Sequence, residues 1–135
     1  MPANLIVHLK EMFAEMTIKK NPSVMAHYYH PDFLLYCNGE VTDYAHFHNM
    51  HEEIYKTPIQ YKVEYDEETL VAQQNKVAGR IFITTSRPNE TPTKIEVILI
   101  VEYKENKIYR LWELTFPDWT RLAAFEKVTQ DNLRD

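Results

Sequence analysis

The sequence predicts an α+β fold in which helices pack on one face of a curved antiparallel or mixed sheet. Two observations lead to this prediction. Near the start of the chain, apolar residues such as Leu5, Leu9 and Met12 recur every three or four positions, which is the pattern of an amphipathic helix. From Ile59 onward, apolar residues alternate with polar ones, which is the pattern of a half-buried strand.

Local patterns predict where each element begins and ends. Asn21-Pro22 is a typical helix start, because Asn caps the first turn and Pro is tolerated at the first helical position. Asn38-Gly39 is a typical two-residue hairpin turn. The expected elements, in order, are helices over about residues 3–18 and 21–30, a short strand at 33–37, a helix from Thr42 or Asp43 to about Lys56, strands at 59–66, 77–85, 95–103 and 108–116, and a short final helix around Trp119, Leu122 and Phe125.

The size and composition predict one globular domain over residues 1–135, with 44% hydrophobic and 13% aromatic residues. The net charge of −5 and the scattered basic residues argue against a nucleic-acid-binding surface. Cys37 is the only cysteine, which excludes an intramolecular disulfide and fits a reducing compartment. Residues 1–20 lack the pattern of a signal peptide, and no apolar run reaches the roughly 20 residues of a membrane span. We therefore expect a cytoplasmic protein that does not bind membranes.

Glu113 is the main candidate for a functional side chain, because it lies inside the apolar strand expected at 108–116. A carboxylate in such surroundings is either paired with another group or shifted in pKa and available for chemistry. In the second case, the exclusion of water should raise its pKa. The structural alternative is an ion pair with Arg80 or a hydrogen bond to a tyrosine hydroxyl.

The last hairpin predicts which residues surround Glu113. The run at 95–103 is apolar almost throughout, so we expect it to be buried on both faces. A three-residue loop with Asn106 in the left-handed conformation would pair Tyr103 with Lys107. The surface shared with Glu113 would then contain Val97, Leu99, Leu111 and Thr115, with Val97 opposite Glu113 and Leu99 opposite Leu111.

The order of the elements and several local patterns resemble a known family. The short strand and its turn read Phe33-Leu34-Leu35-Tyr36-Cys37-Asn38-Gly39, and the last hairpin closes as Glu105-Asn106-Lys107-Ile108 and continues as Arg110-Leu111-Trp112-Glu113. In this order, over residues 5–117, the chain is similar to the SnoaL-like branch of the nuclear transport factor 2-like superfamily. The resemblance implies a cone-shaped sheet wrapped around the N-terminal helices, with Glu113 on the surface that lines the cone.

Members of this superfamily include isomerases, cyclases, epoxide hydrolases, dehydratases and non-catalytic binding subunits, so the resemblance leaves the activity open. The ketosteroid isomerases among them use a general-base Asp where this chain has Cys37, and a second acid near the position of Leu99. They also use a Tyr from the first helix, where this chain has Met12 and Phe13. None of the three positions matches, which argues against steroid isomerisation.

Several other side chains are candidates for the cone beside Glu113. His46 could reach the mouth of the cone as an acid or base near neutral pH, with a solvated helix face as the alternative, and Tyr36 is the candidate tyrosine partner. Arg80 is either a cross-strand partner of Glu96 or Glu113 or an anchor for an anionic ligand. For the tyrosines and the cysteine, simple packing is the alternative. The expected ligand-binding residues are Tyr29, Cys37, Tyr61, Arg80, Val97, Leu99 and Leu111.

We expect neither a cofactor nor a metal ion. The chain has two glycines, which are too few for the clustered glycines of a nucleotide-binding loop. His48 together with His51 or Glu52 has a spacing that could reach one metal ion, but the sequence places no third ligand. A solvated helix face explains these histidines better.

The sequence thus predicts a protein that binds a small molecule in an internal pocket, and it leaves two functions open. One is an acid–base isomerase, cyclase or hydrolase of unknown substrate, and the other is a non-catalytic ligand-binding or dimerisation module. The convex face of the expected sheet would expose a contiguous apolar patch, so we also expect a homodimer through this face. The patch consists of Ile98, Ile100, Trp112 and Leu114.

Overall fold

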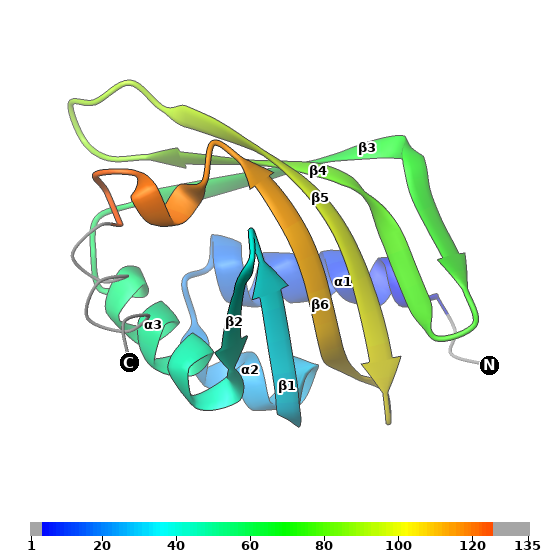
Figure 1. Cartoon of the computed structure of the whole chain (residues 1–135). Coiled ribbons are helices and arrows are strands. Elements are labelled where there is room, and N and C mark those ends of the chain that lie inside the picture. Colours follow the sequence, from blue (N-terminus) through cyan, green and yellow to red (C-terminus); the bar gives the residue numbers. More distant parts are fainter. Residues whose placement is uncertain (1–3, 126–135) are drawn as a thin grey trace.

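The computed structural model describes residues 4–125, so residues 1–3 and 126–135 of the predicted domain lie outside the described part. Its fold is α+β, as predicted, with the helical segments first and the long strands after them (Figure 1). The elements are α1 (Leu5–Met12), a π-helix (Phe13–Ile18), a 3₁₀ turn (Pro22–Val24), α2 (Met25–Tyr28), β1 (Tyr29–Cys37), β2 (Glu40–Asp43), α3 (Tyr44–Tyr55), β3 (Gln60–Gln73), β4 (Lys76–Ser86), β5 (Thr93–Lys104), β6 (Lys107–Phe116) and a 3₁₀ turn (Trp119–Arg121).

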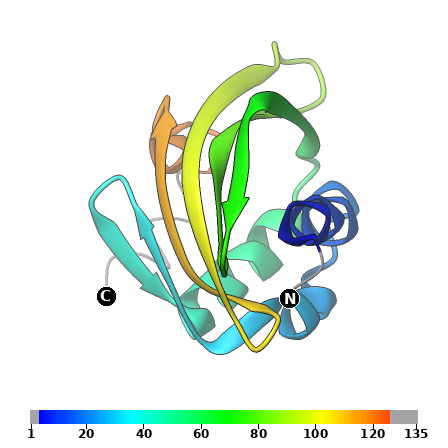
Figure 2. The ribbon, with the colours of Figure 1, turned by 90° about the vertical axis from the view of Figure 1, so that its right-hand side faces the viewer.

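The six strands form one mixed sheet in the order β2-β1-β6-β5-β4-β3. β1 and β6 are parallel, and the other neighbours are antiparallel. The sheet curves strongly, and the helices lie along its concave side (Figure 2). The buried core lies between this concave face and the helices. Within residues 4–125, no helix is long and apolar enough to span a membrane.

The helix starts and the first turn agree with the sequence patterns. Asn21 accepts a hydrogen bond from the Ser23 backbone, and Asp43 caps α3 by accepting one from the His46 backbone at 2.9 Å. Asn38 and Gly39 both have positive φ angles, of 50° and 88°, as a two-residue hairpin turn requires. This turn pairs β1 with β2, a strand that the sequence patterns did not predict.

The predicted register of the last hairpin is wrong by one residue next to the turn and by two residues at Glu113. Glu105 and Asn106 both have positive φ angles, of 54° and 65°, so they form a two-residue turn and Lys104 pairs with Lys107. Tyr103 pairs with Ile108 and Glu102 pairs with Arg110, so β6 has one residue more than β5 between these two pairs. This extra residue, Tyr109, forms a β-bulge. As a result, Leu99 lies opposite Glu113, Val97 opposite Thr115 and Val101 opposite Leu111.

The prediction that residues 95–103 are buried on both faces is also wrong. Val97 and Leu99 are each 2% exposed, whereas Ile98 is 46% and Ile100 is 43% exposed. The reason is that the helices cover one face of the sheet, and the described residues place no element over the other. A two-residue error in register leaves the faces unchanged, because side chains alternate with a period of two. Val97, Leu99, Leu111, Glu113 and Thr115 therefore still share the concave face, as predicted.

Candidate functional site

A cavity of about 120 Å³ lies between the concave face of the sheet and the helices. α1, the π-helix, α3, strands β1 and β3–β6 and the segment after β6 contribute its wall. Most lining side chains are aliphatic or aromatic, as in the majority of small-molecule sites. The polar or partly polar lining residues are Thr17, Tyr29, His51, Tyr55, Tyr61, Thr85, Glu113, Thr115 and Trp119.

Glu113 is an acidic side chain in the wall of this cavity, and protein encloses its carboxyl group. The residue as a whole is of intermediate exposure and lines the cavity. Among residues 4–125, no Lys, Arg or His forms an ion pair with it, so no cation offsets the loss of hydration of its charged form. This burial raises the pKa of Glu113 from 4.5 to about 7, while a hydrogen bond from Cys37 acts in the opposite direction.

The side chain that contacts the Glu113 carboxyl is Cys37, which lies opposite it on the parallel strand β1. The Cys37 thiol is buried, and the indole of Trp119 approaches it from the segment after β6. Burial is the largest cause of a strong rise in the pKa of Cys37, and the neighbouring Glu113 adds to it. A thiol with a raised pKa is protonated at neutral pH, so Cys37 serves here as a weak hydrogen-bond donor rather than as a nucleophile.

Thr115 is a second polar group on the same face of β6, two residues after Glu113. Asn38 fixes its orientation, because the Asn38 amide nitrogen donates to Thr115 Oγ1 at 2.8 Å and the Thr115 backbone donates to Asn38 Oδ1 at 2.9 Å. The Thr115 hydroxyl therefore accepts from Asn38 and keeps its own proton to donate. Glu113 and Thr115 together form the polar part of the cavity wall on β6.

The tyrosines of the cavity differ in how their hydroxyl groups are satisfied. Tyr29 is buried and donates to the sulfur of Met12 at 3.5 Å, and the Tyr55 hydroxyl bonds to Thr17. The Tyr61 hydroxyl, in contrast, is buried without a hydrogen-bond partner among the described residues. Such a group costs about 1–3 kcal/mol of stability unless a partner reaches it. It is therefore a position at which a bound molecule could gain a hydrogen bond.

Seven of the ten residues predicted for the site lie in or next to the cavity. Cys37 is behind the wall, in contact with Glu113. The side chains of Val97, Leu99 and Leu111 form the apolar floor beside the carboxyl group. The predicted residues that line the cavity are Glu113, Tyr29, Tyr61, Val97, Leu99 and Leu111.

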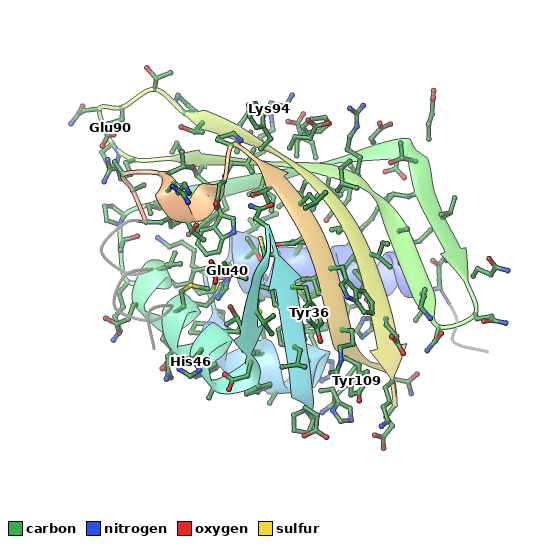
Figure 3. The ribbon with its side chains drawn as sticks, in the orientation of Figure 1. Tyr36, Glu40, His46, Glu90, Lys94 and Tyr109 are labelled. Carbon is green, nitrogen blue, oxygen red and sulfur yellow. The ribbon has the colours of Figure 1, made fainter. Side chains whose placement is uncertain are left out.

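The other three predicted residues lie outside the cavity. Tyr36 points to the convex face and stacks on Trp112, with ring centroids 5.8 Å apart. His46 lies in the first turn of α3, where its Nδ1 is 2.7 Å from Asp43 Oδ1 (Figure 3 labels Tyr36 and His46). Arg80 binds Asp66 and Glu96 on the convex side. Of the two cross-strand partners expected for Arg80, Glu96 therefore forms the ion pair and Glu113 does not.

His51 is the functional candidate that the sequence reasoning missed, because it considered this residue only as a metal ligand. The signal was present in the spacing of α3. His51 lies four residues after Phe47 and three before Ile54, so it is on the same face of the helix as these buried residues, and its partly buried ring lines the cavity. His46 is adjacent to that stripe in sequence and faces another direction.

Among the described residues, no group of three or more His, Cys, Asp or Glu side chains is arranged to hold a metal ion. His48 and Glu52 approach to 3.7 Å on the surface of α3. Their proximity is that of an ordinary i, i+4 pair on a solvated helix face.

The curved mixed sheet and the helices in its concavity form the SnoaL-like, nuclear transport factor 2-like cone fold, as the sequence resemblance implied. No sequence model of a protein family matches the chain, and no curated protein matches it closely in sequence.

Solved structures of this fold are similar to the chain at low sequence identity. PrhC from Penicillium brasilianum NBRC 6234 is 15% identical with a TM-score of 0.69, and the match covers 93% of this chain and 87% of PrhC. IdmH from Streptomyces antibioticus, described as a putative polyketide cyclase, is 14% identical with a TM-score of 0.64, covering 93% and 98%. An LEH-like epoxide hydrolase of M. tuberculosis is 10% identical with a TM-score of 0.66, covering 91% and 87%. At these identities the comparisons establish the fold.

Proposed function

We propose that this protein binds a small molecule in the cone cavity and moves a proton on it with Glu113. The observation that supports this proposal is a buried carboxyl group in the wall of an apolar cavity, without a cationic partner among residues 4–125. Such an arrangement costs stability, because the charged form loses its hydration and gains no partner. Groups of this kind occur most often at functional sites.

The raised pKa suits acid–base chemistry at neutral pH. With a pKa of about 7, both forms of the Glu113 carboxyl are well populated near pH 7. The protonated form can donate to a carbonyl or epoxide oxygen, and the ionised form can accept a proton from a carbon next to a carbonyl group or from water. These steps belong to isomerases, cyclases and hydrolases, and the similar structures include proteins described as a putative polyketide cyclase and an LEH-like epoxide hydrolase.

One observation favours the alternative function, a non-catalytic ligand-binding or dimerisation module of the same fold. Within residues 4–125, the Glu113 carboxyl has one polar contact, the weak Cys37 thiol, and no second titratable partner. Most acid–base enzymes bring at least two polar groups to the reacting atoms. In the proposed enzyme, Thr115 supplies the second polar group.

Two probe reactions test the proposal with the same set of proteins. The first is hydrolysis of cyclohexene oxide, and the second is deuterium exchange next to the carbonyl of cyclohexanone in D₂O. We expect the wild type to accelerate at least one, with an apparent pKa near 7, and Glu113→Gln to lose a factor of about 10²–10⁴.

Glu40→Gln is the matched control, because Glu40 is exposed on β2, opposite Cys37 in the β1–β2 ladder. It should retain the wild-type rate. If the wild type does not exceed the buffer rate in either reaction, or if Glu113→Gln is as active as the wild type, the binding module is the better description.

A further inference from the structure

His51 is a histidine of α3 in the wall of the cavity. One hydrogen bond decides which of its two ring nitrogens carries the hydrogen. Its Nδ1 lies 2.8 Å from the backbone oxygen of Phe47. A carbonyl oxygen can only accept, so Nδ1 must carry the hydrogen. In the neutral ring the hydrogen on Nδ1 leaves a lone pair on Nε2, which is then an acceptor.

The Nε2 atom of His51 has no hydrogen-bond partner among residues 4–125, although the ring lines the cavity. The rings of Phe47 and Tyr55 pack against the imidazole, with centroids 4.1 Å and 5.4 Å away. These apolar surroundings disfavour a charged ring. Burial is the largest cause that lowers the pKa of His51, the hydrogen bond to Phe47 raises it and the neighbouring His48 lowers it, and together they bring it to about 4. At neutral pH His51 is therefore a neutral acceptor with one fixed tautomer.

The rest of the cavity limits the charge and size of what it can hold. No Lys or Arg lines it within the described residues, so an anion would be buried without a partner. A cation would have to give up its hydration together with the Glu113 carboxylate in a mostly apolar cavity, and the loss of hydration of a buried ion pair can exceed its attraction. The volume of about 120 Å³ is close to that of a cavity of about 150 Å³ that accepts benzene.

We propose that the cavity takes an uncharged, mostly apolar molecule of about one ring that carries a hydroxyl group, and that Nε2 of His51 accepts the hydrogen bond from this hydroxyl. The inference adds a ligand class to the proposed function and rests on the same cavity. It concerns binding rather than turnover, so it stands or falls separately from the proton transfer by Glu113.

Phenol, fluorobenzene and benzoate are suitable probes, because they share a ring and differ in the donor and the charge. Binding is measured by NMR titration of the wild type with ¹⁵N-labelled histidine. We expect phenol to bind about five times more tightly than fluorobenzene, the value of one net hydrogen bond, and benzoate to bind at least about ten times more weakly than phenol. Phenol should also shift the His51 Nε2 resonance, and fluorobenzene should not.

His51→Phe keeps a ring of similar size and removes the acceptor, so its preference for phenol over fluorobenzene should fall to about one. His48→Phe is the control on the same helix, outside the cavity lining, and should keep the preference. The Nε2 signature in the wild type tests the proposal even if His51→Phe folds poorly. The proposal would be overturned if a folded His51→Phe still preferred phenol over fluorobenzene. It would also be overturned if phenol left the His51 Nε2 resonance unmoved, or if phenol did not bind up to its solubility.

Comparing this titration with the two probe reactions on the wild type separates this inference from the proposed function. If the wild type is inactive in both probe reactions but phenol shifts Nε2, the ligand class holds and the catalytic role fails. If the wild type is active but phenol binds without using His51, the catalytic role holds and the assignment of His51 fails.

Discussion

Cys37 on β1 lies opposite Glu113 on β6 in the parallel part of the sheet, and its thiol hydrogen-bonds to the Glu113 carboxyl. The two groups affect each other in opposite directions. The thiol stabilises the carboxylate and lowers the pKa of Glu113, whereas the carboxylate raises the pKa of Cys37. Because a thiol is a weak donor, the effect of burial dominates and the pKa of Glu113 stays near 7.

The first prediction concerns the pH dependence of stability. The pKa of Glu113 is raised in the folded chain to about 7, above its ordinary value of 4.5, so the folded state favours the neutral form. The contribution of Glu113 to the free energy of unfolding is therefore most favourable below about pH 4.5 and is lost as the pH rises through about 7. Glu113→Gln stays neutral and avoids this loss. We expect it to be more stable than the wild type by about 1–3 kcal/mol above pH 7, and by much less near pH 4.5.

Denaturant unfolding of both proteins between about pH 4.5 and pH 8 measures this difference, with Glu40→Gln as the exposed control. A difference that is independent of pH would show that the carboxyl is not buried as described. A large loss of stability in Glu113→Gln at every pH would instead show that Glu113 holds a structural partner.

The second prediction concerns the contribution of the Cys37 thiol. Cys37→Ala removes the hydrogen-bond donor, so the pKa of Glu113 should rise above its wild-type value. Cys37→Ser keeps a donor of similar size and should leave the pKa at or below that value. The ¹³C resonance of the Glu113 carboxyl, followed through a pH titration, reports both results. Equal pKa values in the wild type and Cys37→Ala would mean that the thiol does not act on Glu113.

The third prediction is a homodimer through the convex face of the sheet. The register places Ile100 opposite Trp112 and Ile98 opposite Leu114 on this face, and Leu114 is 64% exposed. A second copy related by a two-fold axis is a common way to cover such an apolar patch. Trp112→Glu should give a monomer by light scattering at micromolar concentration, whereas the wild type should give twice that mass.

Val7→Glu provides the control for this experiment, because Val7 is 53% exposed on α1, away from the convex face. It should leave the mass of the wild type unchanged. A monomeric wild type would contradict the prediction, and an equal effect of Trp112→Glu and Val7→Glu would argue against a specific interface.

Features that depend on a few neighbouring residues could be predicted from the sequence. Asn21-Pro22 and Asp43 begin helices because a cap acts within one turn, and Asn38-Gly39 turns because both residues tolerate positive φ. The concave position of Glu113 was also predictable. Any register that keeps the apolar residues inward places it on the same face, so the two-residue error did not matter.

Features that depend on contacts between distant elements were decided by the tertiary structure. The bulge at Tyr109 and the two-residue turn at Glu105-Asn106 set which residue lies opposite Glu113, and no local pattern distinguishes them from a longer loop. The spacing of α3 places His51 on the apolar face of the helix, but only the packing of that face against the sheet makes His51 part of the cavity wall. Arg80 could have paired with either of two carboxylates. Arg80 and Glu96 lie on the convex face and Glu113 on the concave face, so Arg80 reaches Glu96 and not Glu113.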